Sequence, residues 1–366
     1  MGEKQLVILL SLVMFLMIIV TSMFYYFTNQ KNSKDAIEID SSVEQKEDGH
    51  FETQVISSNL MTPWSIVFYD DIPLISSRDT GQIYEINEDG TSRIVGTIDE
   101  VTHRGEGGLL GLTIHHTNLY AYYTTSIDNR VSRYSLSGER GSLSIRYQET
   151  ILDGLPIASY HNGGRIAFGP DEMLYITVGD AGDTMSAQDL SVYNGKILRM
   201  TRNGEIPDDN PFENSLIYSY GHRNPQGITW DEAGVMYSSE FGQNQWDELN
   251  IIKAGGNYGW PIVEGMEENA EFELPVQQWQ VSQASPSGMT YHDGTLFLAN
   301  LRGTSLRTVS ITDLSKSDTY FNEEYGRIRD VAIAPDGTLW FITNNTDGRG
   351  TPSPDDDRII SVSLNR

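Results

Sequence analysis

Four arginines stand in turns next to apolar, strand-like segments, where they could meet in one site. Basic residues are scarce in this chain, which has 25 Lys and Arg against 51 Asp and Glu. Guanidinium groups gathered together repel one another, and their planar donors match carboxylates, so a shared site would suit an anionic ligand. The alternative is that each arginine pairs with a neighbouring acidic side chain at a surface turn. These arginines are Arg223, Arg302, Arg327 and Arg329.

A histidine and an aspartate form a second candidate set. His161 precedes Asn-Gly-Gly-Arg165, and Asp180 follows one pair of strand-like segments later, in Gly179-Asp-Ala-Gly-Asp183. An imidazole held by a carboxylate has a fixed tautomer, and its second ring nitrogen is then free to act as a base. The alternative is a solvated or hydrogen-bonded histidine without a catalytic role.

The elements that must position these residues recur six times along the chain. Each copy has an apolar stretch of period two, a Gly/Asp turn and two further strand-like segments, and a spacing of about 40 to 60 residues is typical of propeller blades. The pattern contains no convincing long amphipathic helix, which argues against a βαβ fold. We therefore predict an all-β, six-bladed β-propeller, with a strand near residues 51–56 completing the last blade. The copies begin at Trp64, Leu110, Arg165, Gly227, Gly288 and Asp330.

Equivalent turns of a propeller converge on one mouth of its central channel. The turns of Arg223 and of Arg327 and Arg329 lead into first strands, and so does the turn of His161. We therefore expect the cationic set and the histidine to meet at this mouth. The propeller itself does not define the function, because the same architecture serves many activities.

The N-terminal part of the chain differs in composition from the rest. Residues 6–27 are uncharged and mostly apolar, and about 20 such residues span a bilayer. This predicts an uncleaved, single-pass transmembrane anchor over residues 1–27, with a cleaved signal and secretion as the alternative. Residues 28–50 are polar and aperiodic, which predicts a flexible tether. The folded domain, residues 51–366, is expected to be extracytoplasmic.

Charge and cysteine content exclude several classes of function. The formal net charge is −26, whereas nucleic-acid binding requires a basic footprint. The chain has no cysteine, which rules out disulfides, thiolate metal sites and a cysteine nucleophile.

Several motifs together resemble a known family. The stretches Tyr160-His-Asn-Gly-Gly-Arg-Ile-Ala-Phe, Gly221-His-Arg-Asn-Pro-Gln-Gly and Gly256-Asn-Tyr-Gly-Trp-Pro resemble the soluble pyrroloquinoline quinone (PQQ)-dependent glucose/sorbosone and aldose sugar dehydrogenases. The resemblance covers residues 59–364. The short link between Gly182 and Asn194 is more similar to the aldose sugar dehydrogenase branch than to the dimeric glucose dehydrogenases, and a monomer is expected.

The resemblance implies a role for each candidate residue. His161 would be the base that removes the proton of the anomeric hydroxyl, Asp180 would orient it, and Arg223 would polarise the quinone carbonyl that receives hydride. Glu106 departs from the family, because it stands where the glucose dehydrogenases have a glutamine, and Arg302 falls where they use a lysine against the cofactor. A carboxylate near an anionic cofactor is costly unless it is protonated or paired. The positions placed against the cofactor are Glu106, Arg223, Asn224, Gln226, Arg302, Arg327 and Arg329.

The resemblance also implies calcium, which favours oxygen ligands and accepts backbone carbonyls. The carbonyls of Gly242 and Gln243 correspond to the loop of a catalytic Ca²⁺, although Gln243 stands where the glucose enzyme has proline. Glu248 and the backbone of Tyr258 correspond to a second, structural Ca²⁺. The alternative for Glu248 is a solvated carboxylate on an outer strand.

The expected function is the PQQ-dependent oxidation of aldose sugars to lactones, with electrons passed to an unidentified acceptor. Two other classes remain open. A calcium-dependent propeller lactonase would need carboxylates and Asn around one exposed metal and would not need four arginines. A non-catalytic cell-surface binding propeller would not need His161 together with Arg223.

Overall fold

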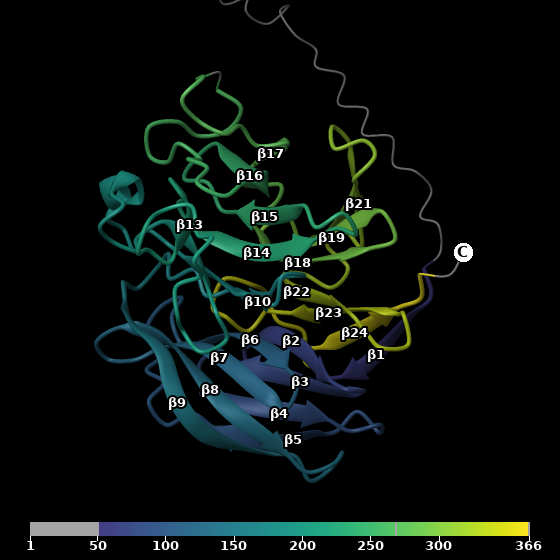
Figure 1. Ribbon diagram of the computed structural model, residues 1–366. Coiled ribbons are helices and arrows are strands. Elements are labelled where there is room, and N and C mark those ends of the chain that lie inside the picture. Colours follow the sequence, from purple (N-terminus) through teal and green to yellow (C-terminus); the bar gives the residue numbers. More distant parts are fainter. Residues whose placement is uncertain (1–50, 268, 365–366) are drawn as a thin grey trace, which may run out of the picture. The chain divides into compact units, whose positions relative to one another are not determined.

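The computed structural model describes residues 51–267 and 269–364, which form six four-stranded antiparallel sheets around one axis (Figure 1). This confirms the prediction of an all-β, six-bladed propeller. The predicted anchor at 1–27 and tether at 28–50 lie outside the described residues. Within the described residues, no helix is long and apolar enough to cross a membrane.

Each blade places one inner strand at the central channel. In blades 1 to 5 the chain then proceeds outward through three more strands, and in blade 6 through two. The six inner strands are β2 (Pro63–Tyr69), β6 (Leu109–His115), β10 (Ile166–Phe168), β14 (Pro225–Trp230), β18 (Pro286–His292) and β22 (Ile328–Ile333). All six run in the same direction, so the turns before them open on one end of the channel, here called the mouth. The hairpin turns that follow them lie at the opposite end, here called the hairpin face.

The remaining strands build the blades in chain order. In blades 1 to 3 they are β3 (Ile72–Ser77), β4 (Gln82–Ile86), β5 (Ser92–Thr97), β7 (Asn118–Thr124), β8 (Asn129–Ser137), β9 (Ser144–Leu155), β11 (Leu174–Val178), β12 (Lys196–Met200) and β13 (Ile217–Tyr220). In blades 4 to 6 they are β15 (Met236–Glu240), β16 (Trp246–Ile252), β17 (Gln277–Gln280), β19 (Thr295–Asn300), β20 (Ser305–Ser310), β21 (Ser317–Tyr320), β23 (Leu339–Thr343) and β24 (Ile359–Val362). A short 3₁₀ helix, η1 (Thr184–Gln188), lies between β11 and β12.

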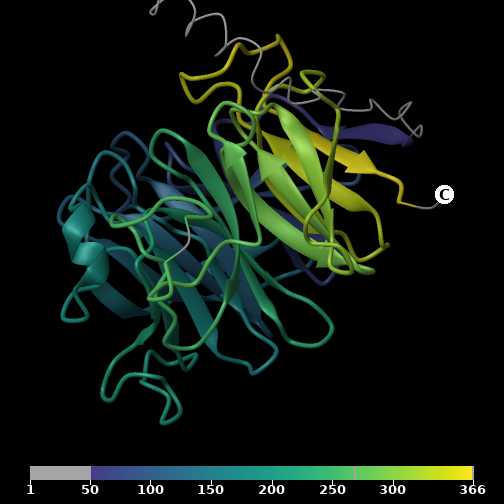
Figure 2. The ribbon, with the colours of Figure 1, turned by 90° about the horizontal axis from the view of Figure 1, so that it is seen from above.

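The ring is closed by the first described strand. β1 (Thr53–Ser57) pairs with β24 as the fourth strand of blade 6, with Thr53 opposite Val362. Figure 2 shows the purple β1 at the edge of the yellow blade 6, with the light-green blade 5 beside it. The predicted closing strand is therefore present, and its pairing satisfies an edge that would otherwise be open.

The middle strands of the blades are apolar on both faces because each blade packs against two neighbours. β7 is an example, since its residues from Leu119 to Thr124 are all buried. Its side chains alternate between two core clusters, with Tyr120 and Tyr122 in one and Leu119, Ala121 and Tyr123 in the other. Successive side chains of the strand point to opposite faces, and those on both faces find apolar partners. This explains why the strand pattern of the sequence is so regular.

A buried ion pair joins four blades across the channel. Asp330 of β22 accepts hydrogen bonds from the Ile66 backbone N–H (3.0 Å) and from Arg165 Nη1 (2.8 Å). Arg165 precedes β10 and also donates through Nε to the carbonyl oxygen of Gln226 (2.9 Å), and its guanidinium lies 4.3 Å from the ring centroid of Trp64. Burial raises the pKa of Asp330 and outweighs the lowering effect of Arg165. The charge of each partner is therefore tolerated only because the other is present.

Candidate active site

His161 lies at the mouth in the turn before β10, and its backbone is held in an unusual conformation. Its φ is +57°, a region that residues other than glycine rarely adopt. The turn fits because Gly179 has no side chain, since a Cβ at that position would lie 2.0 Å from the His161 carbonyl oxygen. Such local strain is frequent at functional sites.

Asp180 fixes the orientation of this imidazole. Its Oδ1 accepts hydrogen bonds from His161 Nδ1 (2.7 Å) and from the Gly182 N–H (2.8 Å). Its Oδ2 accepts one from the Trp260 indole Nε1 (2.9 Å). Burial would raise the pKa of Asp180, but the hydrogen bonds from His161 and Gly182 lower it overall, so the group is an anion at neutral pH.

The anionic Asp180 assigns the tautomer of His161. Because the carboxylate can only accept, Nδ1 carries the proton and Nε2 keeps its lone pair. Nε2 has no hydrogen-bond partner among the described residues, and the side chain is 14% exposed. This arrangement leaves a basic nitrogen directed away from Asp180 and reachable from the mouth.

Arg223 and Asn224 stand beside this pair in the turn before β14. The backbone N–H groups of both residues donate to Glu240 Oε1, and Arg223 Nη1 donates to the Phe241 carbonyl oxygen at 3.1 Å. Burial lowers the pKa of Arg223, and the nearby Asp180 and Glu240 act in the opposite direction. Glu240 thus holds this turn through its backbone and leaves most donors of the Arg223 side chain available.

Arg329 is buried at the base of the mouth with weak partners. Its contacts are to Ser287 Oγ at 3.2 Å and to Gln226 Oε1 and Asn344 Oδ1 at 3.4 Å. Burial lowers the pKa of Arg329 to about 9, although Asp347 opposes this. No described carboxylate lies within ion-pair distance of it. A buried cation with only long, neutral contacts is costly, so this position favours an anionic partner.

Arg327 is partly explained by the surface-turn alternative, since its Nη2 contacts Asp347 Oδ2 at 3.0 Å. Burial would raise the pKa of Asp347, but Arg327 and Arg329 lower it overall. Even so, some donors at this end of the channel are buried and have no acceptor among the described residues. They are Arg223 Nε, Asn224 Nδ2, Arg327 Nε and Arg329 Nε. All four are N–H groups, which fits a ligand rich in carboxylate and carbonyl oxygens.

Glu106 also reaches the mouth, and it is paired. Its Oε1 lies 2.8 Å from Arg349 Nη1, and its Oε2 accepts the His161 backbone N–H at 3.0 Å. Burial would raise the pKa of Glu106, but Arg349 and the His161 N–H lower it overall. The expected cost of a carboxylate beside an anionic ligand is therefore offset by Arg349, which the sequence analysis missed. Arg349 stands between two glycines, Gly348-Arg-Gly350, which is a sequence signal similar to that of the four predicted arginines.

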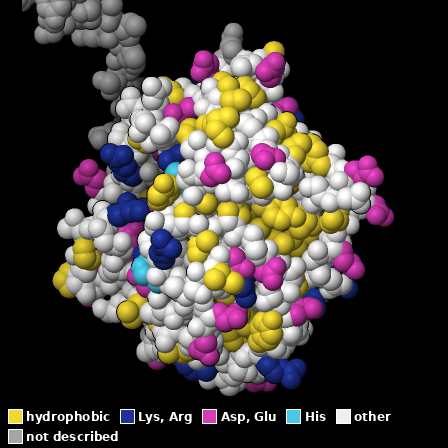
Figure 3. Space-filling model, turned by 90° about the vertical axis from the view of Figure 1, so that its left-hand side faces the viewer, with side chains coloured by type: hydrophobic (Ala, Val, Ile, Leu, Met, Phe, Trp, Pro, Cys, Tyr) yellow, Lys and Arg dark blue, Asp and Glu magenta, His cyan; other side chains and the backbone are white. Residues whose placement is uncertain are grey.

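Arg302 is the one predicted arginine that the structure does not join to the others. It lies in the turn between β19 and β20 on the mouth side, where it is exposed. No hydrogen bond or ion pair connects it with another residue of the described ranges. Figure 3 views the mouth side, where dark-blue basic and cyan histidine side chains gather near a hollow.

The predicted calcium positions are close to one another. Four consecutive backbone N–H groups, those of Gln243, Asn244, Gln245 and Trp246, donate to Glu264 Oε1. Glu248 lies opposite Glu240 across β15 and β16, and both line a small cavity that Tyr258 and Glu264 also border. Burial, together with Glu240, raises the pKa of Glu248 to about 8. Glu248 is half-buried and its Oε1 accepts a hydrogen bond from the Gly265 N–H at 2.7 Å, so it is not a fully solvated carboxylate.

A cation would relieve the crowding of these carboxylates. The described residues contain no group of three or more His, Cys, Asp or Glu side chains placed to hold a metal ion. Any metal here would therefore need backbone carbonyls as ligands, which is the kind of donor that the sequence analysis assigned to Gly242, Gln243 and Tyr258.

Comparison with known proteins gives a consistent family match. The model of the glucose/sorbosone dehydrogenase family matches residues 60–352. The PQQ-bound aldose sugar dehydrogenase of Streptomyces coelicolor superimposes with a TM-score of 0.81 and 41% identity, over 86% of this chain and 98% of that one.

Two curated proteins are similar in sequence. The quinoprotein glucose dehydrogenase B of Acinetobacter calcoaceticus is 32% identical over 61% of this chain, and the match spans only 55% of that protein. The aldose sugar dehydrogenase of Escherichia coli K12 is 28% identical over 81% of this chain and 90% of its own length.

Proposed function

The chain belongs to the glucose/sorbosone dehydrogenase family, and we propose that it is a PQQ-dependent dehydrogenase that oxidises aldose sugars at the anomeric carbon to lactones. The observation that carries the proposal is the His161–Asp180 pair beside four buried donors without acceptors. A base with a fixed tautomer and a pocket for an anionic cofactor are the two parts that this reaction requires.

Some residues of the mouth would bind the cofactor, and others would take part in proton transfer. Arg329, Arg327 and Asn224 would hold the carboxylates and carbonyls of PQQ. When bound, PQQ supplies the acceptor for the hydride of the sugar. His161 would take the proton of the anomeric hydroxyl at Nε2, while Asp180 keeps the ring in place and stabilises the resulting imidazolium. Arg223, next to His161, would stabilise negative charge that develops on the acceptor side.

The proposal is tested with the full-length chain, PQQ, Ca²⁺ and an artificial electron-accepting dye. We expect dye reduction that depends on both PQQ and an aldose, with a lactone as the product. Hydrolysis of lactones with Ca²⁺ alone, without uptake of PQQ, would instead support a propeller lactonase. Neither activity, with no PQQ bound, would support the binding-module alternative.

Replacing Arg329 by alanine should weaken PQQ binding about tenfold to a hundredfold, because a hydrogen bond to a charged group contributes about 1.5–3 kcal/mol. The affinity is measured by the quenching of tryptophan fluorescence during PQQ titration. Arg146→Ala serves as the control, since Arg146 is exposed on the outer strand β9. Equal affinities of the two variants would assign Arg329 to the fold rather than to the cofactor.

We also propose that Ca²⁺ binds the Glu248 cavity and the neighbouring loop of Gly242 and Gln243. Ca²⁺ at a concentration of about 100 times its Kd should stabilise the protein by about 2.7 kcal/mol, seen as a higher Tm than in EDTA. Glu248→Gln should abolish most of this shift because the variant lacks the anionic ligand. The exposed Glu232 provides the control variant Glu232→Gln. An unchanged Ca²⁺ shift in Glu248→Gln would place the ion elsewhere.

A further inference from the structure

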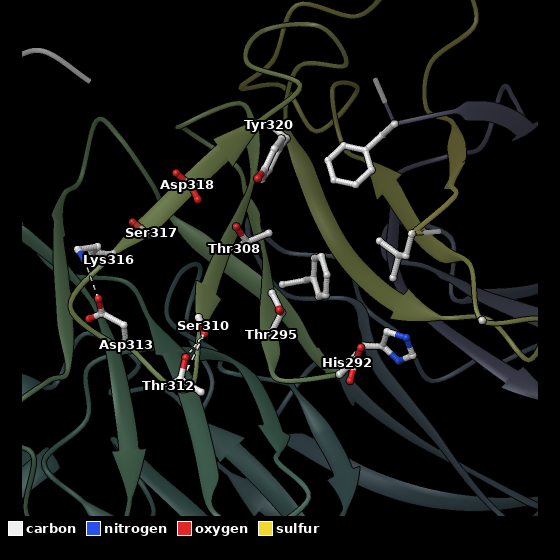
Figure 4. Close-up of a pocket in the computed structure, with 15 residues that line it drawn as sticks. His292, Thr295, Thr308, Ser310, Thr312, Asp313, Lys316, Ser317, Asp318 and Tyr320 are labelled. Atoms are coloured by element: carbon white, nitrogen blue, oxygen red, sulfur yellow. Dashed lines mark hydrogen bonds and ion pairs between the residues drawn. The ribbon is translucent and has the colours of Figure 1, made fainter. Parts of the chain in front are cut away.

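A large groove lies between blades 5 and 6, towards the hairpin face and away from the mouth (Figure 4). Its volume is about 630 Å³, within the range of about 300–1,000 Å³ that is usual for small-molecule sites. Its floor is formed by β19, β20 and β21. Phe51 and Leu364 of blade 6 contribute to the opposite wall.

The floor is polar where a blade interface is normally apolar. The strand register aligns Phe297, Thr308 and Asp318 in one row, and Thr295 lies opposite Ser310 in the next. Side chains that are directly opposite one another in a sheet share a face, so these five residues face the groove together.

Blade 4 shows what the same face looks like when it is packed. There Tyr237 lies opposite Ile251, and both belong to the hydrophobic cluster between blades 4 and 5. In blade 5 the corresponding pair is Phe297 and Thr308. The cluster between blades 5 and 6 includes Phe297 and Leu306 but stops before Thr308. A hydroxyl thus replaces an aliphatic side chain at the point where the groove opens.

The polar groups of the groove are largely available. The side chains of Thr295, Thr308, Asp318 and Tyr320 make no hydrogen bond to any residue in the described part of the chain, and Figure 4 shows these residues along the groove. By contrast, Asp313 at the rim is already paired with Lys316 at 3.0 Å. The free groups combine hydroxyls, which both donate and accept, with a carboxylate, which only accepts.

This chemistry selects a class of ligand. Hydroxyls and carboxylates complement a molecule with many hydroxyl groups of its own. The rings of Phe51 and Tyr320, with centroids 5.1 Å apart in an edge-on arrangement, offer apolar surface to the C–H faces of such a molecule. Asp293 and Asp318 disfavour anionic ligands, and the strongly negative net charge of −26 adds to this effect.

We propose that this groove is a second binding site, separate from the mouth, for neutral oligosaccharides. It would hold a carbohydrate chain without taking part in its oxidation, because the groove opens on the side of the propeller opposite His161. The proposal is independent of the function of the mouth.

The test is isothermal titration of the full-length chain with maltohexaose, cellohexaose and chitohexaose, in the absence of PQQ. We expect at least one of them to bind, and Asp318→Ala and Thr308→Val to weaken its binding at least tenfold. Asp153→Ala changes an exposed aspartate on β9 and should bind like the wild type. Tetragalacturonic acid, an anionic probe, should bind at least tenfold more weakly than the neutral chain.

Two results would overturn the proposal. One is the absence of binding by the wild-type protein to all three neutral probes. The other is a Thr308→Val variant that unfolds at a higher temperature and still binds as the wild type does, because the groove would then be only a poorly packed blade interface. Thermal unfolding of all variants is measured alongside, so that a loss of binding is attributed to the groove only in folded protein.

Discussion

Replacing His161 by alanine is expected to lower aldose turnover by about 10²–10⁴-fold, because a positioned base contributes about that factor to proton transfer. PQQ binding should be preserved, since the arginines and Asn224 remain. The measurement is a single-turnover reduction of PQQ-loaded protein by an aldose. Asp180→Asn should give a smaller loss, because the imidazole is then present but less well oriented.

The chain offers a closely matched control for this experiment. His116 is also a histidine with positive φ, +56° against +57° for His161, but it is exposed in the hairpin turn between β6 and β7. His116→Ala therefore changes the same residue type in the same backbone conformation without affecting the mouth. Wild-type turnover in loaded His161→Ala protein would show that another group is the base.

Replacing Arg165 by methionine is expected to lower the free energy of unfolding by about 3–5 kcal/mol, the usual cost of leaving one partner of a buried ion pair alone. Asp330 would remain without its cation in the channel, held only by backbone donors such as the Ile66 N–H. The measurement is urea unfolding followed by tryptophan fluorescence. The mouth residues are not replaced, so the effect should appear in stability first.

Lys253→Met is the control for this second prediction, because Lys253 forms an exposed ion pair with Glu273, and such pairs contribute about 0–1 kcal/mol. Adding Asp330→Asn to Arg165→Met should recover part of the loss, since the uncompensated charge is then removed. Equal stability of Arg165→Met and Lys253→Met would mean that Asp330 is neutral in the folded protein.

The sequence predicted the repeated blades well because each blade is a local unit. Strand alternation and turn residues lie within a few tens of positions of one another, and both faces of the middle strands find apolar partners. The closing strand was predictable for a different reason, namely that a propeller edge must be paired. His161 and Asp180 were found because they flank adjacent strands of one blade.

The contacts that the sequence did not predict join different blades. Trp260 donates to Asp180 across 80 positions, and Arg349 reaches Glu106 from the other end of the chain. No periodicity specifies such pairs, because they depend on how neighbouring loops fold over the mouth. Arg302 was predicted to join the other arginines but is not connected to them. A turn on the mouth side therefore does not ensure that its side chain reaches the other basic residues.

The pairing of β1 with β24 has a consequence for biosynthesis. Thr53 is made early, but its partner Val362 follows roughly 300 residues later, which takes about 15–60 s at the usual 5–20 residues per second of translation. During that time the earlier blades can fold while β1 has no partner and exposes its backbone edge. β1 lowers the risk of aggregation by being short, and the polar side chains of Thr53 and Gln54 are exposed even in the finished ring. The closing contact is also highly non-local, so ring closure should be among the last and slowest events of folding.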